Sequence, residues 1–267
     1  MKLAFTTLGC TGWDLDTIIA RAVEYGYDGV DFRGYRGELK IYELPEFTAD
    51  LEATVAKFDD AGLDVPCLST SARVCADPAG AIEEVRRYAP LCEAFGATMM
   101  RVFGGPLGEM SREQAIDATA DTLRAAGAIA ADYGAAVLLE THDAWPDGRH
   151  LKAVMERAGS DAVGVLWDVM HPFNAVGETP AATTALLGRW IRYTHFKDAR
   201  RGGDGKLHLC PIGEGDLPLA DCVAQLRAIG YDGWLTLEWE KQWHADLDEP
   251  EAAYPQYVKV MRRLLGA

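Results

Sequence analysis

The sequence has no uninterrupted apolar run of the ~18 residues that a membrane-spanning helix needs. The apolar stretch in residues 1–10 is short, contains threonines and continues into polar residues, unlike a signal peptide. The six cysteines are scattered and include no C-x-x-C pair, which argues against a zinc knuckle or a disulfide framework. These absences predict a cytoplasmic protein with reduced thiols and no membrane partner.

Positive charge is also scarce. There are 26 Lys and Arg residues against 41 Asp and Glu residues, for a formal net charge of −15. Proteins hold polyanions with surfaces rich in Lys and Arg, so this balance argues against nucleic acid as a partner. The other proportions, 49% hydrophobic and 25% charged residues in 267, exclude a disordered or fibrous chain.

A dinucleotide-binding turn is missing as well, because no G-x-G-x-x-G follows the first apolar segment. Instead the chain repeats one unit, in which an amphipathic helical stretch ends at a glycine and a short, largely apolar strand follows. Glycine after a helix turns the chain back, and apolar pentads are typical of strands covered on both faces. The eight expected strands begin near residues 2, 29, 65, 99, 136, 163, 191 and 234.

Eight strand–helix units spread over about 250 residues match the size of a TIM barrel. A doubly wound sheet normally has fewer strands. The chain shows no linker and no break in composition between these units. The sequence therefore predicts an α/β protein, with residues 1–267 forming a single (β/α)8 TIM barrel domain.

Polar residues stand at the carboxyl ends of four consecutive expected strands, where a TIM barrel has its active site. These residues, which we call the quartet, are Glu140, Asp168, His195 and Glu238. A single acid at such a place is often only a helix N-cap, and a single histidine is often a core residue. Four in register predict one divalent metal ion, with Mn²⁺ or Mg²⁺ preferred by the oxygen-rich set and Co²⁺ or Zn²⁺ accepted.

Strings around the quartet resemble the xylose isomerase-like TIM barrels, also called sugar phosphate isomerases or epimerases. They are residues 101–105 (RVFGG), 138–143 (LLETHD), 167–172 (WDVMHP), 194–198 (THFKD), 211–216 (PIGEGD) and 230–238 (GYDGWLTLE). The resemblance covers essentially the whole chain and is specific for the fold and the metal site. It leaves the substrate open, because the family includes epimerases, isomerases, dehydratases and lyases.

The resemblance implies roles for individual residues. The quartet corresponds to the metal ligands of the family, with Mn²⁺ as the first choice of ion. In its ketose 3-epimerases, glutamates at the positions of Glu140 and Glu238 flank the substrate and move the proton beside its carbonyl through a metal-bound enediolate. His171 and Arg201 resemble residues that hold substrate oxygens. The chain is thus expected to be a metal-dependent isomerase or epimerase of a sugar or keto-sugar.

His142 departs from the epimerase pattern. Those enzymes carry a substrate-holding glutamate six residues beyond the first metal ligand, where this chain has Pro146. His142 stands two residues beyond Glu140 and either orients it or removes a proton next to a ketone. The second role suits the alternative function, a lyase or dehydratase that performs β-elimination on a 3-keto glycoside or keto-inositol.

A remote alternative is DNA repair of the endonuclease IV type, which shares the barrel. That enzyme uses a histidine-rich trinuclear site and a basic face, whereas this chain has six histidines and a net charge of −15. Steep salt-dependent binding to abasic DNA would be its signature.

Several residues outside the quartet are candidates for substrate contacts. Lys197 and Arg201 can hold an anionic group, although a pairing of Lys197 with Asp198 or a quartet carboxylate fits better. Asp31 and Arg33, at the end of the second expected strand, are expected to pair with each other or with acids at the rim.

Aromatic and loop residues complete the set. Trp13 and Trp145 are expected either to stack on a sugar ring or to pack in the interior, and His208 to lie near the barrel mouth. The glycine-rich residues 200–206 form either a lid or a simple connector. Seven tryptophans offer contact area for a homo-oligomer.

Overall fold

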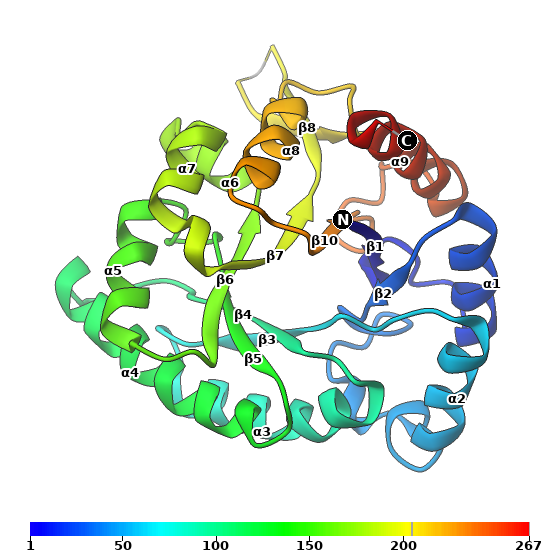
Figure 1. Ribbon diagram of the computed structural model, residues 1–267, viewed down its shortest axis with the longest axis horizontal. Coiled ribbons are helices and arrows are strands. Elements are labelled where there is room, and N and C mark those ends of the chain that lie inside the picture. Colours follow the sequence, from blue (N-terminus) through cyan, green and yellow to red (C-terminus); the bar gives the residue numbers. More distant parts are fainter. Residues whose placement is uncertain (204, 267) are drawn as a thin grey trace.

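The computed structural model describes residues 1–203 and 205–266. Eight parallel strands form a nearly closed barrel surrounded by helices, as Figure 1 shows, which confirms the predicted TIM barrel. The barrel strands are β1 (Lys2–Thr6), β2 (Gly29–Asp31), β3 (Cys67–Arg73), β4 (Met99–Phe103), β5 (Ala136–Glu140), β6 (Val163–Asp168), β7 (Ile191–Phe196) and β10 (Trp234–Leu237). The helices of the described residues are α1 (Leu15–Tyr25), α2 (Leu51–Ala61), α3 (Pro78–Phe95), α4 (Arg112–Ala131), α5 (Gly148–Ala158), α6 (Met170–Val176), α7 (Pro180–Leu187), α8 (Leu219–Ala228) and α9 (Pro250–Leu265).

The strands follow the order β2-β1-β10-β7-β6-β5-β4-β3 around the barrel. Parallel bridges between Gly29 and Asp64 and between Phe32 and Leu68 join its two edges. Strand β3 begins two residues later than expected because Pro66 has no N–H to donate to the ladder. In this order β1 pairs with both β2 and β10, so residues from both ends of the chain border the same mouth.

Glycine ends several helices as the sequence predicted. Helices α1, α2 and α3 are followed by Gly26, Gly62 and Gly96, each in the left-handed conformation. This conformation is unfavourable for residues with a Cβ atom, so glycine reverses the chain there at little cost.

The barrel interior forms an apolar floor below the carboxyl ends of the strands. Leu138, Leu166 and Tyr193 are fully buried there in one cluster. Each stands two residues before a member of the quartet, and alternate residues of a strand share a face. The same alternation therefore directs the quartet side chains into the barrel, above this floor.

One element was not predicted. Strands β8 (Asp198–Arg201) and β9 (Leu207–Cys210) pair as an antiparallel hairpin outside the barrel sheet. Figure 1 shows this hairpin near α8, towards the edge of the molecule. All six cysteines are free. Within the described part of the chain, no helix has both the length and the apolar character needed to cross a membrane.

Candidate metal centre

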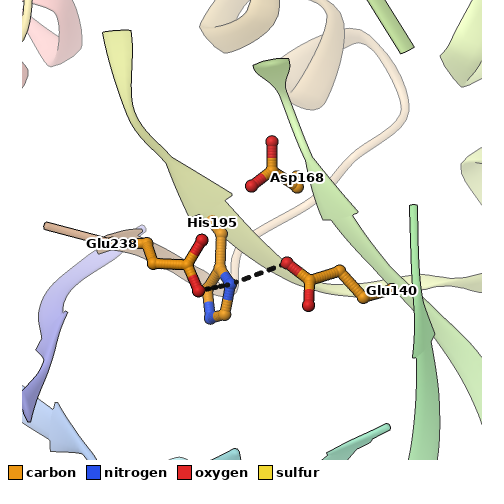
Figure 2. Close-up of side chains that lie close together, drawn as sticks. All are labelled: Glu140, Asp168, His195 and Glu238. Atoms are coloured by element: carbon orange, nitrogen blue, oxygen red, sulfur yellow. Dashed lines mark hydrogen bonds and ion pairs between the residues drawn. The ribbon is translucent and has the colours of Figure 1, made fainter. Parts of the chain in front are cut away.

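The structure brings the four members of the quartet together at the barrel mouth. Glu140 and Asp168 are the last residues of β5 and β6, His195 lies near the end of β7, and Glu238 follows β10 directly. All four are buried, and their ligand atoms lie within 4.8 Å of one another. Figure 2 shows the imidazole of His195 between the two glutamates, with Asp168 on the side of β6.

The two ring nitrogens of His195 face different partners. Its Nδ1 lies 3.2 Å from Oε1 of Glu140 and 3.4 Å from Oε1 of Glu238. Its Nε2 lies 3.4 Å from Oδ2 of Asp31, which also accepts a hydrogen bond of 2.9 Å from Ser69. A carboxylate on the outer nitrogen is the usual partner of a metal-binding histidine and leaves the other nitrogen free for the ion. Asp31 thus pairs with His195 and not with Arg33.

Lys197 forms the centre of an ion-pair network. Its Nζ lies 2.9 Å from Oδ2 of Asp168, 2.6 Å from Oε2 of Glu238 and 2.5 Å from Oε1 of Glu240. The side chain is only 1% exposed. Of the partners considered from the sequence, Lys197 therefore takes quartet carboxylates. Asp198 instead accepts hydrogen bonds from the backbone N–H groups of Ala199 and of three residues between 213 and 217.

Arg101 of β4 supplies a second buried cation. Its Nη1 lies 3.4 Å from Oε2 of Glu140, and its guanidinium stands over the ring of Phe103 at 3.8 Å. The side chain is fully buried, and none of its nitrogens makes a hydrogen bond within the described residues. The sequence places Arg101 in a family string but does not predict its contact with Glu140.

The charge balance of the cluster fits a divalent ion. Three cationic side chains, Lys197, Arg101 and His195, together contact five carboxylates, those of Asp31, Glu140, Asp168, Glu238 and Glu240. Among the described residues, Oε2 of Glu140 and Oδ2 of Asp168 accept no hydrogen bond, and each has one cation beside it, Arg101 at 3.4 Å and Lys197 at 2.9 Å. Buried charged oxygens are costly unless they are paired or bind a metal. A hard dication is suited to these oxygens and would offset the excess negative charge.

The protonation states of the quartet also suit ligation. Burial raises the pKa of Glu140, but Arg101 and His195 lower it more, to well below its ordinary value. The pKa of Glu238 falls to about 2, because Lys197 and His195 outweigh its burial. Burial lowers the pKa of His195, yet Glu238, Asp31 and Glu140 raise it to about 10. The glutamates are therefore ionised at neutral pH, and an ion must displace a proton to bind His195.

A hollow of about 300 Å³ borders the cluster at Glu238 and Glu240. Its lining comprises Leu8, Arg33, Arg73, Phe103, His142, Asp143, Glu238, Glu240 and Trp243. His142 therefore faces the space that borders Glu238. Its Nδ1 lies 2.9 Å from Oδ1 of Asp143, and its ring centre is 4.3 Å from that of His171. His171 in turn lies 3.8 Å from Oδ2 of Asp168, so both histidines stand beside the quartet.

Trp13 and Trp145, which were expected either to stack on a sugar ring or to pack in the interior, do not line this hollow. Trp13 donates to Oε1 of Glu251 at 3.1 Å. Trp145 is fully buried and donates to the carbonyl of Gly105 at 2.9 Å. Phe103 lines the hollow, and the tryptophan that lines it is instead Trp243, which is 54% exposed. It lies in an irregular segment after β10, where no periodic pattern singles it out.

Arg201 and His208 lie on the hairpin. Both are exposed, and neither lines the hollow. The guanidinium of Arg201 donates to the carbonyl of Gly205 at 2.9 Å, within the same hairpin. Residues 198–201 pair antiparallel with residues 207–210, so Arg201 and His208 belong to this two-stranded hairpin. The suggested lid, residues 200–206, belongs to this hairpin, and its Asp204 lies outside the described residues.

Asp31 offers a test of the metal centre that leaves the quartet unchanged. Asp31→Asn is expected to weaken Mn²⁺ binding by about 10–100-fold, because the amide no longer fixes the imidazole of His195. Isothermal titration calorimetry of the two proteins with Mn²⁺ measures this. Asp28→Asn is the matched control, since Asp28 accepts a hydrogen bond from Leu3 near the opposite end of β2. Equal affinity of Asp31→Asn and the unaltered chain would show that Asp31 does not support a metal site.

A family model described as xylose isomerase-like TIM barrel matches residues 19–264. A comparison with curated proteins finds no match.

Solved structures share the fold over almost their whole length. The probable 3-DHS dehydratase AsbF of Bacillus anthracis has a TM-score of 0.79 at 20% identity, covering 98% of each chain. The IOLI protein with a bound zinc atom has a TM-score of 0.83 at 20% identity, covering 100% of this chain and 98% of its own. The 3-keto-D-glucoside 4-epimerase YcjR of E. coli has a TM-score of 0.76 at 16% identity, covering 100% of each chain.

Proposed function

Because the chain belongs to the xylose isomerase-like TIM barrel family, we propose that it is a divalent-metal-dependent isomerase or epimerase of a sugar or keto-sugar. The observation that carries the proposal is the buried quartet, in which Glu140 and Glu238 stand on either side of His195. The hollow of about 300 Å³ above Glu238 is of a size that takes a small ligand. This hollow and the net charge of −15 favour a small molecule over nucleic acid as the partner.

The quartet would hold the ion, with Mn²⁺ preferred by its three carboxylates and one imidazole. A divalent ion bound there would polarise a substrate carbonyl and stabilise the negative charge that develops on its oxygen. The fold of IOLI, whose structure contains zinc, supports a metal at such a barrel mouth.

The two glutamates would move the proton. Each is ionised at neutral pH, because its neighbouring cations outweigh the effect of burial on its pKa. One carboxylate would remove the proton from the carbon next to the carbonyl, and the other would return a proton to the opposite face. Lys197, 2.6 Å from Oε2 of Glu238, holds that carboxylate in place.

His142 favours a second candidate, the β-elimination of a leaving group from a 3-keto glycoside or keto-inositol. The imidazole lines the hollow and is 2.9 Å from the carboxylate of Asp143, an arrangement suited to a general base. Asp143 has a positive φ of 52°, uncommon for a residue other than glycine. The shared fold accommodates both reactions, since AsbF is described as a dehydratase and YcjR as an epimerase.

Isotope exchange in D₂O tests the proposal. With Mn²⁺ and a panel of ketoses and 3-keto-glycosides, we expect deuterium at the carbon next to the carbonyl of an otherwise intact sugar, detected by NMR and mass spectrometry. EDTA should abolish the exchange and added Mn²⁺ should restore it. A product with a new double bond or a released leaving group would favour elimination, and full activity without metal would refute both candidates.

A further inference from the structure

Arg33 is a buried cation that forms no ion pair with any carboxylate in residues 1–203 and 205–266. It follows β2 and is 6% exposed. Its backbone N–H donates to Oγ1 of Thr7 at 3.0 Å, and its Nη1 donates to Oγ of Ser71 at 2.9 Å. Burial and the neighbouring Arg101 lower its pKa to about 10. A buried charge is costly unless it is paired. Within the described residues, the guanidinium of Arg33 donates its hydrogen bond to a neutral hydroxyl, that of Ser71, so it is suited to bind an anion from outside the chain.

Arg33 stands where two hollows meet. A larger hollow of about 900 Å³ adjoins the first, and Arg33, Arg73, Phe103 and Trp243 line both. Arg73 is exposed, and it too forms no ion pair with the residues that the structure describes. The junction therefore carries two unpaired positive charges in a protein whose net charge is strongly negative.

Other charges in the larger hollow already have partners. Lys40 lies 3.9 Å from Glu43, and Arg87 lies 2.9 Å from Glu83. Oε1 of Glu84 accepts the backbone N–H of Ser71 at 2.7 Å and is not in an ion pair with either arginine of the junction. The unpaired charge is thus confined to the border nearest the quartet.

We propose that Arg33, together with Ser71 and Arg73, binds an anionic group of the substrate. The substrate of the proposed function is then an acidic sugar derivative that carries a carboxylate or a phosphate. Arg33 and Glu238 line the same hollow of about 300 Å³, so one small molecule can contact both. The planar guanidinium donates two parallel hydrogen bonds to either kind of anion. The proposal rests on the proposed function only for the position of the reacting carbonyl at the quartet.

Calorimetric titration of the full chain tests this subsite. The probes are D-glucuronate and D-glucose 6-phosphate, which distinguish a carboxylate from a phosphate, with D-glucose as the neutral reference. We expect at least one acidic probe to bind more tightly than D-glucose. Arg33→Gln should weaken that binding by about tenfold or more, and Arg73→Gln should weaken it less. Arg86→Gln on the outer surface of α3, where Arg86 lies 3.8 Å from Glu83, should leave it unchanged.

Each titration is made with the Mn²⁺-loaded chain and again after dialysis against EDTA. The second arm excludes binding of the anion to the metal, and it requires neither metal nor turnover. The affinity for the acidic probe can therefore be interpreted even if the proposed function is wrong. Two further variants keep the test valid if Arg33→Gln does not fold: Arg73→Gln, which changes an exposed residue, and Arg33→Lys, which conserves the charge. We expect Arg33→Lys to bind the acidic probe more tightly than Arg33→Gln does. Acidic probes that bind no better than D-glucose, or that bind the folded Arg33 and Arg73 variants as tightly as the unaltered chain, would overturn the subsite.

Discussion

Glu238→Gln is expected to lower the turnover of the Mn²⁺-loaded protein by about 10²–10⁴-fold, the usual contribution of a general acid or base. Glutamine has the same shape but cannot accept the proton that one face of the substrate must lose or gain. Glu140 on the other side of His195 remains in place. We therefore expect the variant to incorporate solvent deuterium at one face of the substrate while its rate of epimerisation falls. Stereospecific exchange followed by NMR measures the two rates separately.

Glu238 is also a proposed metal ligand, so the Mn²⁺ content of each variant must be measured beside its rate. Glu240→Gln is the matched control, since Glu240 contacts Lys197 in the same way but lies outside the quartet. We expect it to cost far less activity than Glu238→Gln. His142→Asn separates the two reactions, because in β-elimination the larger loss would follow from this variant. Turnover of Glu238→Gln equal to that of the unaltered chain, at full metal content, would contradict the proposed proton transfer.

The quartet could be predicted from the sequence because its members obey a local rule. Each ends or follows an apolar strand, and the barrel places all such strand ends at one mouth. The floor beneath them obeys the same rule, since Leu138 and Leu166 precede Glu140 and Asp168 by two residues. The strand starts were predicted to within two residues for the same reason, with the shift at β3 set by Pro66.

Contacts between distant segments could not be predicted in this way. The pairing of Asp31 with His195 spans 164 positions and depends on where the side chains of β2 and β7 meet inside the barrel. The positions of Trp13 and Trp145 depend on the acceptor that each indole N–H reaches. For Trp13 it is a glutamate of α9, and for Trp145 it is a backbone carbonyl after β4. The hairpin is not predictable in this way because its two strands are only four residues long and β8 is mostly polar. Trp243 lies in an irregular segment without a helical or strand period, so the sequence does not indicate which way its side chain points.

Lys197→Met is expected to reduce the free energy of unfolding of the EDTA-treated protein by about 3–5 kcal/mol, as the removal of one partner from a buried ion pair does. Methionine nearly preserves the volume but leaves Asp168, Glu238 and Glu240 without the cation that contacts all three. These ion pairs outweigh burial and raise the pKa of Lys197 well above its ordinary value. Urea denaturation measures the change. Lys57→Met is the control, because the exposed pair of Lys57 with Asp16 should contribute at most about 1 kcal/mol.

The same variant separates a charge effect from a packing effect. If Lys197 stabilises the cluster through its charge, saturating Mn²⁺ should recover part of the lost stability, since an ion that binds only the folded chain stabilises it and adds positive charge among the same carboxylates. The difference between Lys197→Met and the unaltered chain should then be smaller in Mn²⁺ than in EDTA. A residue that merely fills space would show the same difference under both conditions. If Lys197→Met lowered the free energy of unfolding by less than about 1 kcal/mol in EDTA, Lys197 would contribute no more than an exposed ion pair does, and its proposed role in the metal centre would be wrong.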